Sequence, residues 1–287
     1  MIADHVIPFV FDALPVRGAL INLSRSWRRM LRDQHYDRII QETLGHAAAA
    51  TGLIAQSLKF DGAVTLQIQG DGELRMLVMQ CTSDFEIRGM ANVDEDGDAG
   101  TFGDLMNNAH CAITVDAGDR PYQGIVEIEQ SSLADSLQNY FARSVQVPSH
   151  VILVSDNSLS GGILLQQMPG QYMMDDDDWD RLGYIAATLR NNDFDSADGV
   201  ELIGKLFAED DVRVFKSKPV VFRCPCSLER VEEVLRMLGE DETQNAVAEQ
   251  GQVDVTCEYC GRCRSFDPID ISRLFADNVV TGPDSVQ

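Results

Sequence analysis

The sequence predicts an α+β protein with three parts: an N-terminal domain over residues 1–172, a helical linker over 173–220 and a small C-terminal domain over 221–287. Three observations support this division. In the first part, apolar and polar residues alternate as in β-strands, with hairpin turns between them. In the second part, apolar residues form two stripes at helical spacing. Five of the seven cysteines lie in the third part. A chain of 287 residues is long enough for one sizeable core and a smaller module.

The N-terminal domain combines a long helix with strands that alternate in polarity. Residues 36–58 carry apolar side chains at helical spacing, with alanines between them. Residues 64–68 alternate between apolar and polar, a glycine-rich turn follows at 70–72, and 74–79 return as the second arm of a hairpin. A capped helix is expected at 133–143. Further strands are expected at 85–91, 112–115, 122–129, 151–154 and 163–168. This pattern predicts a mostly antiparallel or mixed sheet with covering helices.

Residues 173–220 are predicted to form a helical linker. The aspartates at 175–178 suit a helix start, because carboxylates stabilise the positive end of the helix dipole. One apolar stripe begins at Trp179 and a second covers residues 202–207, with a loop expected at 191–199. The stripes are too large to leave in water, so we expect the linker to pack on a neighbouring surface.

The C-terminal domain is predicted to contain two short helices and a strand. Ser227 can cap a helix that Gly239 ends, and a second helix is expected at residues 242–249. Val253 and Val255 then alternate with polar residues in a strand. A domain of about 60 residues has a small core and usually needs a staple such as a metal ion.

Two closely spaced cysteine pairs flank these elements. One residue lies between Cys224 and Cys226, two residues lie between Cys257 and Cys260, and thirty residues separate the pairs. Four thiolates suit tetrahedral zinc, so the sequence predicts a zinc site made of these four cysteines. We interpret Cys263 as a bystander thiol, because two pairs already complete a tetrahedron.

Spacing alone leaves the role of this site open. Most four-cysteine zinc sites are structural. A redox role is the alternative, because metal-bound thiolates can be oxidised to disulfides that no longer hold the metal. A thiol–disulfide oxidoreductase would need its Cys-x-x-Cys pair at a helix start, whereas Cys257 follows a predicted strand.

Composition argues against several classes of function. The formal net charge of −23 should keep the chain soluble and repel nucleic acid and anionic membranes. Residues 221–287 contain 6 arginines and no lysine against 13 acidic residues. This argues against the alternative of a structural zinc ribbon that binds nucleic acid, and leaves open one that binds a protein partner.

The sequence contains no recognisable active site. A phosphate-binding loop, a dinucleotide fingerprint and a nucleophile elbow are all missing, so the chain is not expected to be an enzyme. The N-terminus lacks the basic segment of a signal peptide, and no apolar run approaches the length of a membrane span. We therefore expect a cytoplasmic chain without membrane partners.

Several short stretches together form a distinctive pattern. The C-terminal ones are residues 222–227, 229–231 and 257–261. Five N-terminal ones accompany them, at residues 16–18, 58–62, 69–72, 122–124 and 140–144. The pattern extends over nearly the whole chain and resembles the redox-regulated 33 kDa heat-shock chaperones, the 33 kDa chaperonin family.

The resemblance implies an ATP-independent holdase that binds unfolding client proteins under oxidative stress. It implies that Cys224, Cys226, Cys257 and Cys260 bind zinc in a reduced, inactive monomer. Oxidation would form the disulfides Cys224–Cys226 and Cys257–Cys260, release zinc, unfold the small domain and the linker, and give an active homodimer. Cys263 departs from the family's motif and could alter this pairing.

Overall fold

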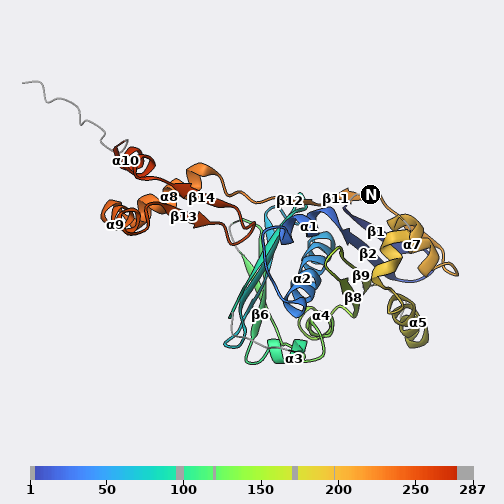
Figure 1. Ribbon diagram of the computed structural model, residues 1–287. Coiled ribbons are helices and arrows are strands. Elements are labelled where there is room, and N and C mark those ends of the chain that lie inside the picture. The colour runs from blue at the N-terminus through green and yellow to red at the C-terminus, as the bar shows by residue number, and fades with distance from the viewer. Residues whose placement is uncertain (1–3, 95–99, 119–120, 170–173, 197, 277–287) are drawn as a thin grey trace, which may run out of the picture. The chain divides into compact units, whose positions relative to one another are not determined.

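Figure 1 presents the computed structural model, which describes residues 4–94, 100–118, 121–169, 174–196 and 198–276. The chain divides by its contacts into two compact units, one up to Arg223 and a second from Cys224 onward. Within the described residues, the first unit contains two six-stranded sheets and the second unit contains a two-stranded one. The predicted α+β class is confirmed.

The first sheet is antiparallel throughout. Its strand order is β10–β1–β2–β9–β8, and β11 also pairs with β1. The strands are β1 (His5–Phe11), β2 (Val16–Leu23), β8 (Ser149–Ser155), β9 (Ser160–Gln167), β10 (Val212–Val214) and β11 (Lys218–Pro219). Segments from both ends of the first unit therefore meet in one sheet.

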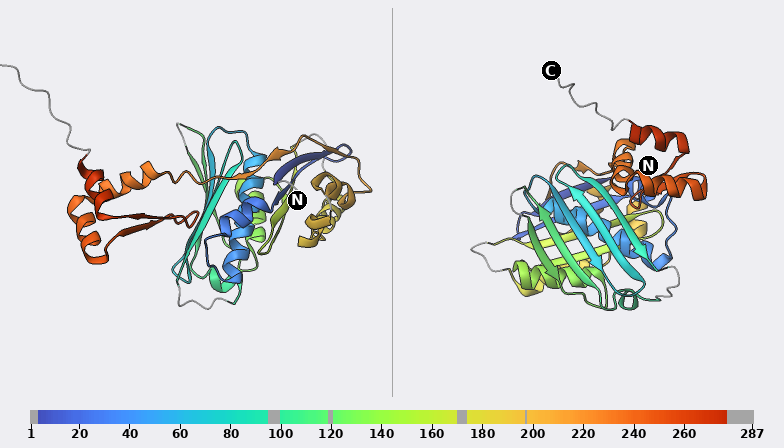
Figure 2. Two further views of the ribbon diagram at one scale, coloured as in Figure 1. Left: turned by 45° about the horizontal axis from the view of Figure 1, so that its top comes forward. Right: turned by 90° about the vertical axis from the view of Figure 1, so that its left-hand side faces the viewer.

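The second sheet has the order β12–β5–β4–β3–β6–β7, and the right-hand view of Figure 2 looks onto its strands. All its pairs are antiparallel except that of β12 with β5, which is parallel. The strands are β3 (Ala63–Gln69), β4 (Leu74–Thr82), β5 (Glu86–Val93), β6 (His110–Asp116), β7 (Tyr122–Val126) and β12 (Val221–Phe222). The predicted hairpin at residues 64–79 is confirmed as β3 and β4.

A long helix fills the space between the two sheets. α2 (Arg38–Ser57) contacts strands of both sheets and lies between them in Figure 1. Its central alanines, Ala47 to Ala50, are buried, and such small side chains allow backbone to approach from both sides. The other helices of this part are α1 (Arg25–Leu31), α3 (Phe102–Leu105), α4 (Leu133–Tyr140) and the π-helical turn η1 (Phe141–Val145).

Three further helices pack against the opposite face of the first sheet. They are α5 (Asp176–Ala186), α6 (Asn191–Ser196) and α7 (Gly199–Leu206). Leu182, Ile203 and Phe207 are buried there, in a core shared with β1, β2 and β9. The predicted stripes thus pack on a neighbouring surface. The loop predicted at 191–199 is wrong, since it holds α6, and Phe194 of this helix is buried in the same core.

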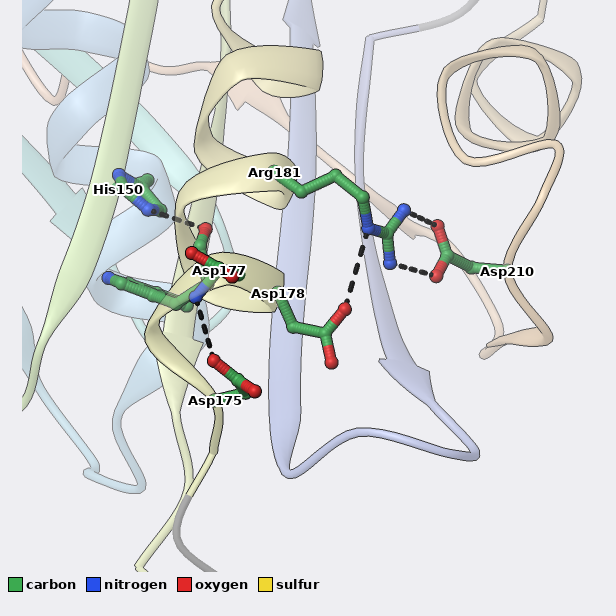
Figure 3. A network of polar contacts seen from close by, with 7 residues as sticks. His150, Asp175, Asp177, Asp178, Arg181 and Asp210 are labelled. Carbon is green, nitrogen blue, oxygen red and sulfur yellow. Dashed lines mark hydrogen bonds and ion pairs between the residues drawn. The ribbon is translucent and has the colours of Figure 1, made fainter.

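Polar contacts fix α5 at both of its sides (Figure 3). Asp175 caps the helix by accepting a hydrogen bond of 3.0 Å from the backbone two residues on, which confirms the helix start predicted at the aspartates. The imidazole of His150 in β8 stacks on Trp179, with ring centroids 4.1 Å apart. Arg181 donates two hydrogen bonds, of 2.7 and 3.0 Å, to the carboxylate of Asp210 after α7.

The second unit has a small core of its own. Its elements are α8 (Leu228–Leu238), α9 (Glu240–Gln250), β13 (Val253–Thr256), β14 (Cys263–Phe266) and α10 (Pro268–Ala276). Among the described residues, its buried apolar cluster consists of Leu235, Val247, Phe266, Ile271 and Leu274. So few buried side chains give a small unit little stability unless a crosslink, such as a bound metal ion, stabilises it further.

The packing of α7 leads to a first prediction. Phe207 is 1% exposed and its ring lies 5.0 Å from that of Phe11. Phe207→Ala should lower the free energy of unfolding by about 3–5 kcal/mol, because it leaves a cavity in this core. Val200→Ala, at a half-exposed position of α7, is the matched control and should change it by less than about 0.5 kcal/mol. Urea unfolding measures both, and equal effects would contradict the packing.

Candidate metal centre

Two loops of the second unit bring four cysteines together. Cys224 and Cys226 lie in the segment just before α8, whose first turn is capped by the hydroxyl of Ser227. Cys257 and Cys260 lie in the tight turn between β13 and β14. Gly261 closes that turn with a φ of 65°, a left-handed conformation that glycine adopts without steric cost.

The four sulfur atoms occupy one small volume. All of them lie within 4.8 Å of one another. Two close sulfur–sulfur contacts run between the loops, 3.6 Å from Cys224 to Cys257 and 3.3 Å from Cys226 to Cys260. Tetrahedral coordination with zinc–sulfur bonds of about 2.3 Å spaces the sulfurs about 3.8 Å apart. The arrangement therefore fits a tetrahedral metal ion with four thiolate ligands.

The thiols differ in their acidity. Burial raises the pKa of Cys224, and it raises the pKa of Cys260 to about 11. Burial also acts to raise the pKa of Cys226, but hydrogen bonds from the other three sulfurs and the charge of Arg262 outweigh it and lower that pKa. Of these three thiols, that of Cys226 is therefore the most acidic. Holding all four as thiolates requires a cation among them.

An arginine supports the first cysteine loop. The guanidinium of Arg264 donates a hydrogen bond of 3.5 Å to the backbone carbonyl of Cys226. Arg264 lies on the same face of β14 as Phe266, which is buried in the core of the unit. Sequence reasoning did not single out this residue, although the alternation of exposed and covered positions in β14 is the signal that identifies it.

The remaining cysteines lie outside the cluster. Cys263 is exposed at the start of β14, opposite Thr256. Cys81 and Cys111 are buried in the second sheet, where burial raises the pKa of each to about 12 and keeps the thiols protonated. Among the residues that the structure describes, only the four clustered cysteines form a group with metal-ligand geometry. None of the described helices is long and apolar enough to cross a membrane.

Comparisons with known proteins match nearly the whole chain to one protein family. The family model described as Hsp33 protein matches residues 4–267. The 33 kDa chaperonin of Methylobacillus flagellatus is 40% identical over 283 residues, which cover 97% of each chain. That of Nitrosococcus oceani is 38% identical over 277 residues and 96% of each chain.

A solved structure has a similar fold. The crystal structure of the 33 kDa chaperonin from Thermotoga maritima, described as a heat shock protein 33 homolog, matches with a TM-score of 0.77. The match covers 96% of this chain and 99% of that chain, at 22% sequence identity. At this identity the likeness supports the fold.

The sulfur cluster leads to a second prediction. Protein purified under reductant should contain one metal ion per chain by elemental analysis. Cys226→Ser should weaken metal binding more than about 100-fold, beyond the effect of losing an outer-shell partner, because three thiolates remain. Cys263→Ser is the matched control and should keep full occupancy, since its thiol lies outside the cluster. Equal occupancy in both variants, measured by competition with a chromogenic chelator, would contradict the assignment.

Proposed function

This chain belongs to the Hsp33 family, whose members are chaperones rather than enzymes, and we propose that it is a redox-regulated, ATP-independent holdase. In this proposal it binds unfolding proteins under oxidative stress and prevents their aggregation. The observation that carries the proposal is the cluster of four sulfurs within 4.8 Å in a unit with a small core. Family membership and the acidic second unit argue against a nucleic-acid-binding zinc module.

In the reduced state, Cys224, Cys226, Cys257 and Cys260 are proposed to hold zinc. A bound zinc ion would supply the positive charge that keeps four neighbouring sulfurs ionised. The protein's contribution is to place them: the cap of α8 orients one loop, and the turn at Gly261 orients the other. The four donors match the preference of zinc for thiolates.

Oxidation is proposed to convert the four cysteines into two disulfides, Cys224–Cys226 and Cys257–Cys260. For each pair, two thiolates would give two electrons to one molecule of hydrogen peroxide, which would take two protons from solvent and become two molecules of water, while the zinc ion leaves the sulfurs. The pairing follows the family resemblance and keeps each disulfide within one loop. Pairing between the loops is the alternative, because those sulfurs lie 3.6 and 3.3 Å apart, and peptide mapping of the oxidised chain distinguishes the two.

Loss of the metal is proposed to unfold the second unit. A structural zinc ion contributes on the order of 10–16 kcal/mol of folding free energy, whereas whole domains are stable by about 5–15 kcal/mol. The proposed linker, residues 173–220, would then detach from the first sheet. Its buried side chains, with Leu182, Ile203 and Phe207 among them, would supply apolar surface for unfolded chains.

The remaining parts of the proposal concern assembly and location. We propose a monomer in the reduced state and a homodimer after oxidation, since newly exposed apolar surface seeks a partner. The net charge of −23 would keep complexes with clients dispersed. The proposed location is the cytoplasm, where seven cysteines can remain reduced until an oxidant reaches them.

The proposal predicts three coupled signals. Peroxide treatment should release the metal, reduce helical circular dichroism and suppress the light scattering of a heat-unfolding client without ATP. The untreated reduced chain should leave the scattering unchanged. Cys260→Ser should respond weakly, because it removes one proposed pair, and Cys263→Ser should respond as the unsubstituted chain does. An oxidised chain that releases metal and loses helix without holding a client would contradict the function.

A further inference from the structure

An extended segment of the chain occupies the outer edge of β5. We name residues 218–223 the strap, which contains β11 and β12. The backbone N–H of Val221 donates to the carbonyl of Phe85 at 3.0 Å, and that of Arg223 donates to Ile87 at 3.1 Å. These bonds satisfy two carbonyls of an edge strand, so any extended chain in this place would find the same acceptors.

From Val220 to Arg223, the side chains of the strap alternate between covered and exposed. Val220 is 4% exposed in the core between the two sheets, and Phe222 packs against that core. Val221, between them, is 54% exposed. The seat therefore accepts two apolar side chains at alternate positions of a strand, and it leaves the residue between them in solvent.

On the side away from β5, the backbone of the strap forms hydrogen bonds with Ser26 and Asp4. The hydroxyl of Ser26 in α1 accepts a hydrogen bond of 3.0 Å from the N–H of Phe222 and donates to the carbonyl of Val220 at 3.4 Å. The carbonyl of Asp4 accepts from the N–H of Val220 at 3.1 Å. A hydroxyl can serve as donor and acceptor, so it suits a backbone of any sequence.

The charged side chains of the strap make their contacts at its exposed ends. The ammonium of Lys218 lies 4.9 Å from the centre of the Phe85 ring, and Arg223 pairs with Glu86. Such contacts are weak in solvent. Phe85 has a φ of 61°, which is uncommon for an aromatic residue, at the place where its carbonyl receives the strap.

We propose that the edge of β5 at residues 85–87, together with the two apolar positions that Val220 and Phe222 fill, is a binding site for extended segments of unfolded clients. The strap occupies this site in the reduced chain. The inference rests on the proposed function and names one surface on which clients bind. An extended client segment fits this site because the strap is held there through backbone hydrogen bonds, which do not depend on sequence. Arg223 precedes Cys224 directly, so unfolding of the second unit removes the anchor at the strap's end.

Site-specific photo-crosslinking in the full-length chain tests this assignment. The residue p-benzoylphenylalanine replaces Glu86 in one variant and Gln123 in the matched control, an exposed position of β7 at the opposite edge of the same sheet. Each variant is oxidised and mixed with heat-unfolding citrate synthase, and light scattering is recorded on the same samples. Crosslinks to the client at position 86 should exceed those at position 123 and those of the reduced chain at least about fivefold, the factor that corresponds to one or two net hydrogen bonds.

A competing peptide tests whether backbone bonds carry the binding. A synthetic peptide with the strap's sequence, residues 218–223, should reduce crosslinking at position 86. The same peptide N-methylated at the position of Val221 lacks the donor to Phe85, so it should compete about fivefold less well. Equal competition by the two peptides would overturn a backbone-mediated site.

The other outcomes separate this proposal from the function on which it rests. Equal crosslinking at positions 86 and 123 in a chain that suppresses aggregation would overturn the site and leave the holdase function standing. Crosslinks at position 86 to a second copy of this chain, in place of the client, would assign the edge to self-association and also overturn it. Failure of the unsubstituted oxidised chain to suppress aggregation would overturn both.

Discussion

Four sulfur atoms confined within 4.8 Å are the constraint on which the second unit depends. As thiolates they repel one another, so a cation is needed to hold them together in that form. The unit's own buried cluster comprises five apolar side chains among the described residues, which is little for a folded module. In the function proposed above, its folding would depend on the chemical state of its cysteines, and oxidation would lower its stability before it changes any binding surface.

The chain connects this unit to two covered surfaces of the first. Arg223 joins the strap to the first cysteine, and the strap pairs with the first sheet through β11 and with the second sheet through β12. Further back, α5 to α7 cover the outer face of the first sheet, fixed by the contacts of Trp179 and Arg181. These coverings consist of short elements, whereas the sheets they cover are extensively paired. Short elements open at a lower free-energy cost than extensively paired sheets. We therefore expect loss of the metal to release the strap and α5 to α7 while the two sheets stay folded.

Local pattern in the sequence predicts part of this structure. The helix α2, the hairpin of β3 and β4, the aspartate-capped start of α5 and the four clustered cysteines all follow from spacing within short windows. β1 and β2 were missed because the first sheet is buried on both faces, so that residues 16–23 are covered almost continuously and show no alternation. The strap was missed because its pairing with β5 links residues more than 130 positions apart and β12 covers only Val221 and Phe222. Such long-range contacts leave no periodic signal.

Amide hydrogen exchange of the whole chain, measured by mass spectrometry before and after oxidation, shows whether the fold of the second unit depends on its metal ion. The account predicts that the reduced, metal-bound chain protects α8, α9, β13 and β14, and that oxidation abolishes this protection together with that of α5 to α7 and the strap. The hairpin of β3 and β4 should stay protected, because it lies in the middle of the second sheet. Continued protection of α8 and α9 after the metal has left would contradict the account, since the second unit would then fold without the ion that its four sulfurs are proposed to hold.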